Sequence, residues 1–152
     1  MSLKEKLQQD LTESMRARDE IRSSTIRMIL TSIRNEEVAG KEAKELDEKE
    51  LIAVLSREAK KRREAAEAFD QAGAKDRGDV ERAEGKIIAE YLPQQLTEAE
   101  VKDLIAAAIK ETGAATPAQM GLVMKSLQPK IAGRADGALV SNLVKAALAG
   151  GN

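Results

Sequence analysis

The chain has 152 residues with 25 basic and 26 acidic side chains, so its formal net charge is −1. It contains no cysteine and no histidine, which excludes disulfides, thiolate metal sites and the commonest general base and metal ligand. Phe69 and Tyr91 are its only aromatic residues, so the core must be aliphatic. An aliphatic core combined with abundant Glu, Lys and Arg predicts an all-α fold.

Two helices are predicted before Gly40. The first begins at Ser2, which forms the pattern of a capping box with Glu5, and its apolar face carries Leu3, Leu7, Leu11 and Met15. The second follows a charged break at residues 18–20 and ends near Gly40. Its apolar stripe is broad, which predicts contact with more than one neighbouring helix.

A third helix is predicted from the capping box of Asp47 and Glu50 to Gly73, since glycine suits the position just after a helix end. It contains a dense basic run with interleaved acids at residues 57–64. We interpret that run as a solvated face with i,i+4 ion pairs, and we expect the stem of Arg62 to lie along the core. An auxiliary phosphate contact is the alternative.

Residues 74–79 are expected to form a loop or the frayed start of a fourth helix, which ends at Pro93. Gly85 inside this helix indicates either a marginal helix or the close approach of another backbone. We place a domain boundary here. Residues 1–93 are predicted to form an N-terminal four-helix domain, and residues 97–149 a small three-helix C-terminal domain.

The C-terminal domain starts at a third capping box, Thr97 with Glu100, whose helix is closed by Gly113. Thr116 and Pro117 predict the cap and first position of the next helix, with Met120, Val123, Met124 and Leu127 on its apolar face. Pro129 is expected to end that helix, so that Lys130, Gly133 and Arg134 lie in the connection to the next one.

The last helix is predicted to start at Asp136, with Val140, Leu143, Val144, Ala147 and Leu148 on its apolar face. Gly121 lies within the preceding helix, where it predicts the close approach of a neighbour rather than a ligand contact. Residues 150–152 are expected to be disordered.

Charge distinguishes the end of the chain. Residues 113–152 carry four cations and one anion, a net charge of +3, which leaves −4 for the rest; the cations are Lys125, Lys130, Arg134 and Lys145, and the anion is Asp136. This asymmetry favours an anionic partner for the C-terminal domain, with a solvated surface as the alternative. Gly133 and Gly137 flank Arg134, so this turn either provides ordinary cap chemistry or lets Arg134 and the following N–H groups meet a phosphate.

The residues of this C-terminal segment also resemble those of a known protein family. The segment from Gly121 through Val123-Met124-Lys125 to the Gly133-Arg134-Ala135-Asp136-Gly137 turn resembles the C-terminal part of the YqeY family. The resemblance covers nearly the whole chain, including residues 27–30, 72–73 and 91–93. The last third is also similar to the tail domain of the B subunit of the tRNA-dependent amidotransferase, whose corresponding turn looks like Gly-Lys-Ala-Asn. This second resemblance implies contact with tRNA.

No catalytic centre is predicted. The serines have no histidine to activate them, and Lys125 and Ser126 point about 100° apart because they are consecutive on a helix. No glycine-rich phosphate loop is present, and we expect no metal or cofactor. The charged N-terminus is unlike a signal peptide and no apolar run is long enough to cross a bilayer, so we expect a cytoplasmic protein with no membrane partner.

Three hypotheses follow. The first is a non-catalytic accessory protein that binds tRNA or another structured RNA through Lys125, Lys130, Gly133, Arg134 and Lys145, with a salt slope of about −3 to −4 if four phosphates are neutralised. The second, implied by the resemblance, is participation in carbon–nitrogen ligation with glutamine as amido-N-donor. The third is a helical protein-interaction module, with a possible partner in aminoacyl-tRNA metabolism.

Overall fold

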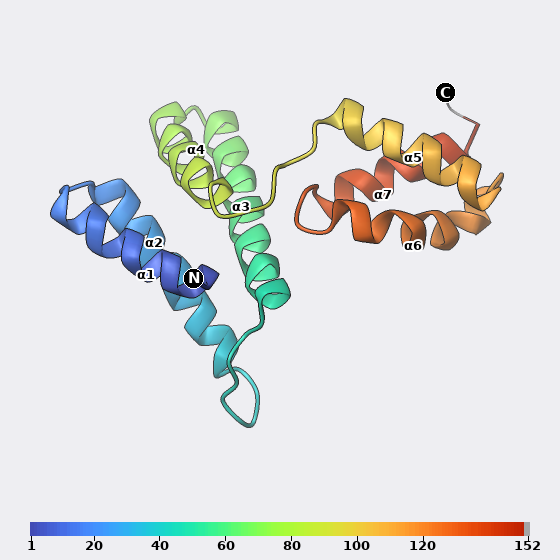
Figure 1. Ribbon diagram of the computed structural model, residues 1–152. Coiled ribbons are helices and arrows are strands. Elements are labelled where there is room, and N and C mark those ends of the chain that lie inside the picture. The colour runs from blue at the N-terminus through green and yellow to red at the C-terminus, as the bar shows by residue number, and fades with distance from the viewer. Residues whose placement is uncertain (151–152) are drawn as a thin grey trace. The chain divides into compact units, whose positions relative to one another are not determined.

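The computed structural model describes residues 1–150 and confirms the all-α prediction (Figure 1). The elements are α1 (Leu3–Arg16), α2 (Glu20–Glu37), α3 (Glu48–Gln71), α4 (Lys75–Ala89), α5 (Glu98–Thr112), the short 3-10 helix η1 (Pro117–Gln119), α6 (Met120–Ile131) and α7 (Gly137–Leu148). No strand occurs within residues 1–150. Of the residues expected to be disordered, Gly150 lies in a turn and residues 151–152 lie outside the described part.

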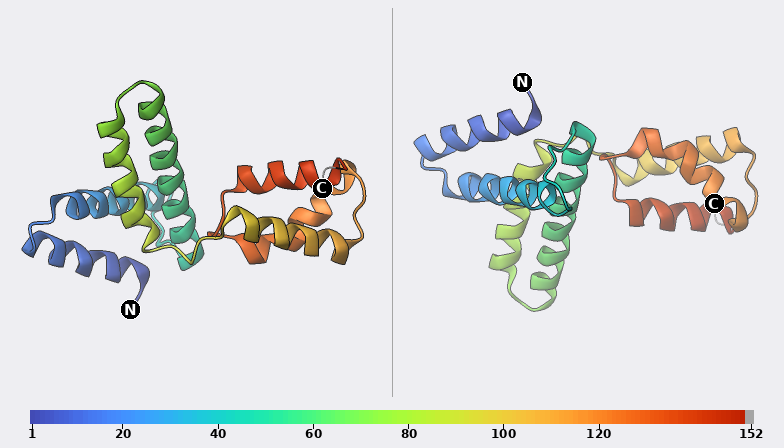
Figure 2. Two further views of the ribbon diagram at one scale, coloured as in Figure 1. Left: turned by 90° about the horizontal axis from the view of Figure 1, so that it is seen from above. Right: turned by 90° about the horizontal axis from the view of Figure 1, so that it is seen from below.

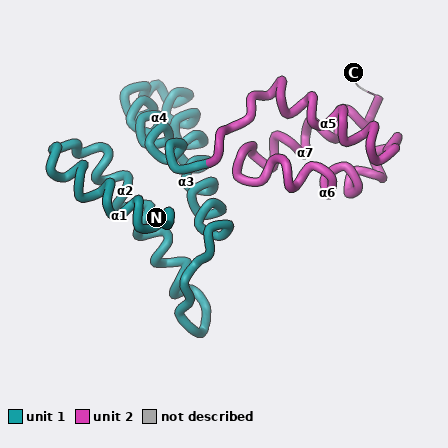
Figure 3. Tube along the Cα trace, in the orientation of Figure 1, with its two compact units in different colours: residues 1–92 teal, residues 93–152 magenta. Residues whose placement is uncertain are grey.

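The chain divides into two compact units, unit 1 (residues 1–92) and unit 2 (residues 93–152), shown separately coloured in Figure 3. In unit 1, α1 pairs with α2 and α3 pairs with α4, each pair forming a helical hairpin (Figures 1 and 2). In unit 2, the helices α5, α6 and α7 pack on one another.

Each unit has its own hydrophobic core. The core of unit 1 is formed by Leu7, Ile26, Ile29, Ile33, Leu46, Leu51, Val54, Leu55, Ile87, Ile88 and Tyr91. The core of unit 2 is formed by Val101, Ile105, Ala108, Ala114, Val123, Leu127, Ile131, Val140, Val144 and Leu148. The spacing of these residues along their helices is the three-to-four-residue repeat that predicted the helices.

The helix ends follow the expected chemistry. Ser2, Asp47 and Thr97 each accept a hydrogen bond from the backbone N–H three residues later, and the glutamate at that position bonds back to the cap backbone. Gly73 and Gly113 follow α3 and α5 with φ of 77° and 70°, in the left-handed region where glycine costs least. These caps set the limits of the first, third and fifth helices.

One expectation about helix limits is wrong. Pro129 does not end α6, which continues to Ile131, and so Lys130 lies on the helix rather than in the connection. The N–H of Ala132 still donates to the carbonyl of Gln128 (3.1 Å), because a proline in the last turn removes only its own donor from the ladder. For residues 74–79, the structure shows the helix start and not the loop: α4 starts at Lys75, and the N–H of Gly78 donates to Ala74 O (3.1 Å).

α3 comes close to α4 at Gly78. A Cβ added there would lie 2.6 Å from Asp70 Oδ1 and 3.1 Å from the carbonyl oxygen of Ala66. At Gly85, where a close approach was one of the two expectations, the nearest atom is the Cβ of Arg62 at 3.7 Å, an ordinary contact. Glycine is therefore required by packing at Gly78 and not at Gly85.

A buried charged cluster joins α3 to α2 and α4. Arg62 is 8% exposed and Glu58 is 6% exposed, and Arg62 Nη1 donates to Glu58 Oε2 at 3.1 Å. Arg62 Nε also donates to Glu84 on α4 (3.0 Å), while Ser32 on α2 donates to Glu58 (3.1 Å). The basic run of α3 therefore has the i,i+4 ion pairs expected from the sequence, including Lys60 with Glu64 at 4.0 Å on its surface. It is not solvated throughout, because Glu58 and Arg62 are buried.

Candidate nucleic-acid interface

The connection between α6 and α7 is a tight turn built around Gly133, whose φ is 72°. The N–H groups of Arg134 and Ala135 both donate to the carbonyl of Ile131, at 2.8 and 3.2 Å. Asp136 then caps α7 by accepting from the N–H of Ala138 (3.2 Å). The left-handed residue lets the chain reverse within a few residues, so that α7 returns along α6.

Arg134 holds this turn to the segment that leads into α5. Its Nε donates to the carbonyl of Gln94 (3.0 Å) and its Nη1 to the carbonyl of Lys130 (3.2 Å). The carbonyl of Arg134 accepts from the N–H of Leu96 (2.8 Å), and Gln95 Nε2 donates to the carbonyl of Gly133 (2.7 Å). The Arg134 guanidinium therefore has a positioning role inside unit 2, which sequence reasoning did not reveal because Gln94 is 40 residues away.

The three lysines of this region are exposed. The side chains of Lys125 and Lys145 make no hydrogen bond or ion pair with the described residues, and Lys130 lies 3.9 Å from Glu111 in a surface pair that contributes little. Lys125 is two residues from Val123 and from Leu127, so it points away from the buried face of α6. These side chains are available to a partner.

The structure brings together some of the predicted site residues and separates others. Lys130, Gly133 and Arg134 meet at the turn. Lys145 lies eight residues after Gly137 on α7, about 12 Å along the helix axis from the turn. The cations thus follow the length of α6 and α7 and do not converge on one point.

Acidic residues are concentrated on the other helix of unit 2. Glu98, Glu100, Asp103 and Glu111 all belong to α5, whereas the only acid after Gly113 is Asp136, whose carboxylate caps α7. The surplus of positive charge is thus confined to α6, the turn and α7. An anionic partner would be attracted to these elements more than to α5.

The prediction for Gly121 is wrong. No atom lies within 4 Å of a Cβ added at this position, and the residue is exposed, so no neighbouring helix requires a glycine there. Helical periodicity shows which face a residue occupies but does not show what lies opposite that face.

Sequence reasoning also missed an apolar groove between α5 and α7. It has a volume of about 470 Å³ and is lined by Lys102, Ile105, Ala106, Ile109, Leu143, Ala146 and Ala147. Alanines facing each other at positions 106, 146 and 147 leave the space between the helices unfilled. The alternation of large and small residues along both helices is the signal that could have indicated it.

Within residues 1–150, no group of three or more acidic side chains is placed to hold a metal ion. None of the helices in the same range combines the length and the apolar character needed to cross a membrane.

Curated proteins similar to this chain share one name. The chain is 35% identical over 88 residues to the protein named Altered inheritance of mitochondria protein 41, mitochondrial, of Lachancea thermotolerans, a match that covers 58% of this chain and 46% of that protein. It is also 35% identical over 86 residues to the protein of that name from Clavispora lusitaniae, covering 57% and 49% respectively. The chain spans about half the length of the curated relatives it matches.

These names overturn the expected cytoplasmic location, because the relatives are named as mitochondrial proteins. The expectation was wrong because a charged N-terminus argues only against a secretory signal peptide. Mitochondrial import relies on a different, amphipathic kind of segment.

The family model described as Yqey-like protein matches residues 4–148, which is nearly the whole chain and includes both units. That match agrees with the resemblance carried by the turn at residues 133–137. The chain belongs to the YqeY family.

Proposed function

We propose that this protein binds structured RNA, most of all tRNA, through the exposed lysines of α6 and α7. In this proposal it is an accessory protein that catalyses no reaction by itself. The observation that supports this most is the set of three exposed lysines, two of them without partners, on elements whose single acid caps a helix. Cations kept free of acidic neighbours are the usual basis of affinity for a phosphate backbone.

The spacing of the lysines favours an extended polyanion over a small anion. Lys130 is beside the turn while Lys145 is near the other end of α7, so one phosphate group would not contact both. Unit 2 has no aromatic residue on which a splayed base could stack. Recognition would therefore depend on the shape and backbone of a folded RNA rather than on base sequence.

Arg134 has a different role from the lysines in this mechanism. Its guanidinium already donates to the carbonyls of Gln94 and Lys130, so a phosphate contact would compete with hydrogen bonds that hold the turn. Gly133 contributes the left-handed backbone that brings Arg134 to those carbonyls. With the three lysines as phosphate contacts, we expect a slope of log affinity against log salt of about −2 to −3.

The test is a titration of fluorescently labelled tRNA at several salt concentrations, read by anisotropy. Replacing Lys125, Lys130 and Lys145 together by glutamine should weaken binding at low salt by at least about tenfold and remove most of the salt slope. The matched control replaces Lys102 and Lys110 of α5 by glutamine and should leave both quantities nearly unchanged. Absence of binding at low ionic strength, or equal effects of the two variants, would reject RNA binding by this surface.

The likeness of the 133–136 turn to that of the amidotransferase tail supports an accessory role in glutamine-dependent carbon–nitrogen ligation. We expect the protein alone to give no amidation of misacylated tRNA, and to raise the rate when catalytic amidotransferase subunits are present. If that rate does not change, the amidation role is excluded, while the RNA-binding proposal is unaffected. A protein partner in aminoacyl-tRNA metabolism stays a prediction.

A further inference from the structure

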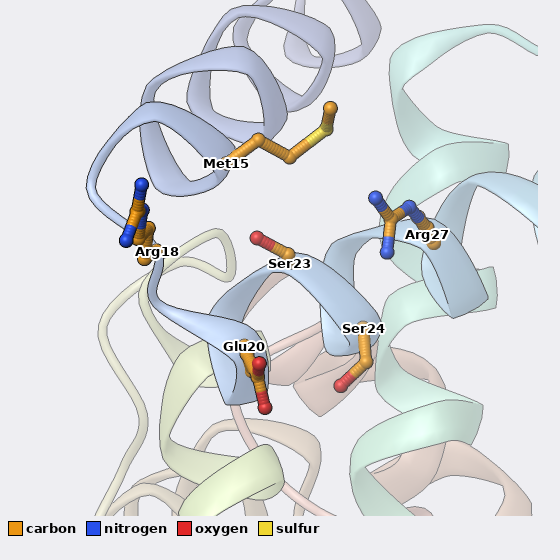
Figure 4. Close-up of a pocket in the computed structure, with 6 residues that line it drawn as sticks. All are labelled: Met15, Arg18, Glu20, Ser23, Ser24 and Arg27. Atoms are coloured by element: carbon orange, nitrogen blue, oxygen red, sulfur yellow. The ribbon is translucent and has the colours of Figure 1, made fainter.

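A second cationic feature lies in unit 1, at the corner where α1 passes into α2. A hollow of about 540 Å³ is lined there by Met15, Arg18, Glu20, Ser23, Ser24 and Arg27. Figure 4 shows Arg18 and Arg27 on opposite sides of Ser23, with the Met15 side chain at one edge and Glu20 and Ser24 at the other. The hollow is therefore bordered by two guanidinium groups.

Neither guanidinium group has a hydrogen bond or ion pair with any residue in the described range 1–150. Several other arginines of unit 1 are paired: Arg22 with Glu90 at 2.6 Å, Arg57 with Glu36 at 3.2 Å and Arg82 with Asp70 at 2.7 Å. Within residues 1–150 the side chains of Arg16 and Arg34 also have no such partner, but they do not border this hollow. Unit 1 carries 21 acids and 19 bases, so acidic partners are abundant. Two arginines that remain unpaired around one hollow indicate a place for an external anion.

The backbone of Arg18 gives an independent indication. Its φ is 58°, the only positive value at a non-glycine residue within the described chain. Arg18 follows the cap residue Ala17 of α1, a position that favours glycine or asparagine because other residues are strained there. Glycine or asparagine would adopt this backbone at lower cost, so an arginine at this position is consistent with a use for its side chain.

The remaining polar groups limit what can bind. The Ser23 hydroxyl is buried in a 2.9 Å hydrogen bond with Ser14, and the Ser24 hydroxyl donates to the carbonyl of Ile21 (3.1 Å). The Glu20 carboxylate would repel a phosphate placed beside it but would accept a hydrogen bond from a ligand hydroxyl. The sugar–phosphate backbone of RNA offers both groups, anionic phosphates for the arginines and 2′-hydroxyls for a carboxylate.

We infer that this hollow is an anion-binding site that takes phosphate groups between Arg18 and Arg27. The phosphates belong either to the backbone of the RNA or to a free phosphorylated compound. In the first case the site is a second anchor for the same RNA and rests on the proposed function. In the second case it is independent of that function.

The test uses the full chain with Arg18→Asn and Arg27→Gln, separately and together. Asparagine removes the guanidinium and tolerates a positive φ, and Arg27 is exposed, so both variants should fold, which circular dichroism checks. The matched control is Arg34→Gln, which removes the same charge from an exposed position on α2 that borders a different hollow. The two probes are inorganic pyrophosphate, followed by backbone amide shifts of residues 18–27, and labelled tRNA, followed by anisotropy.

If the ligand is a free phosphorylated compound, the double variant should bind pyrophosphate about tenfold more weakly, because charge-assisted hydrogen bonds are removed. For the RNA source, it should reduce the tRNA salt slope by about 0.7 to 0.9 for each arginine, with Arg34→Gln giving a smaller change. If the lysine variant of unit 2 has no effect but pyrophosphate binding still depends on Arg18 and Arg27, the proposed function fails and this site stands. If neither probe distinguishes the double variant from Arg34→Gln, the site is rejected.

Discussion

At the residue scale, Tyr91 makes the stability of unit 1 sensitive to alkaline pH. Its ring is 8% exposed and its hydroxyl donates to Asp10 Oδ2 at 2.5 Å. Burial, and then the bond to Asp10, raises the pKa of Tyr91 above its ordinary value. Because the folded state prefers the protonated ring, this stabilisation is fully present below about pH 10 and is lost as pH rises through the folded-state pKa.

We therefore expect the free energy of unfolding to fall as pH increases above about 10, and Tyr91→Phe to lose the part of that dependence that arises from Tyr91. At neutral pH the substitution should cost about 1 kcal/mol, because Asp10 loses a hydrogen bond. The protein has one tyrosine, so tyrosinate absorbance reports this group alone. Ionisation at the pH of a free tyrosine would contradict the assignment.

Two glycines of α4 provide a matched pair. Gly78→Ala would place a Cβ 3.1 Å from the Ala66 carbonyl and closer still to Asp70, so we expect a loss of about 1 to 3 kcal/mol. Gly85→Ala makes only an ordinary contact with Arg62 and should stabilise α4 by up to about 1 kcal/mol. Urea denaturation of the two variants measures the difference, and equal effects would show that packing does not distinguish these sites.

At the element scale, the cluster around Arg62 connects α3 to α2 and α4. Arg62→Met leaves the Glu58 carboxylate buried without its main partner and should cost about 3 to 5 kcal/mol. Replacing the pair together, Arg62→Met with Glu58→Leu, should cost much less, because no buried charge is then left uncompensated. A double-mutant cycle by urea denaturation measures the coupling, and additive losses would contradict a shared buried pair.

The sequence predicted the helices and their caps better than the contacts between them. Capping boxes and apolar spacing are local patterns, and the structure confirms those at Ser2, Asp47 and Thr97. The bond from Arg134 to Gln94 joins residues 40 apart and had no local signal. The prediction of a close neighbouring helix at Gly121 was wrong for the same reason, because a helical pattern does not show whether another element packs against a given face.

At the scale of the whole molecule, each unit should fold when expressed alone. Unit 1 and unit 2 have separate cores, and the Arg134 bonds that hold the start of unit 2 lie entirely within it. We expect a fragment of residues 93–152 to be helical and to unfold cooperatively in urea, at a lower denaturant concentration than residues 1–92 because a smaller chain buries less surface. Circular dichroism measures both, and an unfolded 93–152 fragment would show that its core depends on unit 1.

Within the described chain, every buried polar or charged side chain belongs to unit 1: Ser14, Ser23, Thr25, Glu37, Glu58 and Arg62. The buried side chains of unit 2 are all aliphatic. Hydrophobic stabilisation weakens on cooling, whereas the cost of removing ions from water falls on heating. Cooling should therefore lower the stability of unit 2 before that of unit 1, whereas unit 1, with its buried ion pairs, should keep more of its stability on heating.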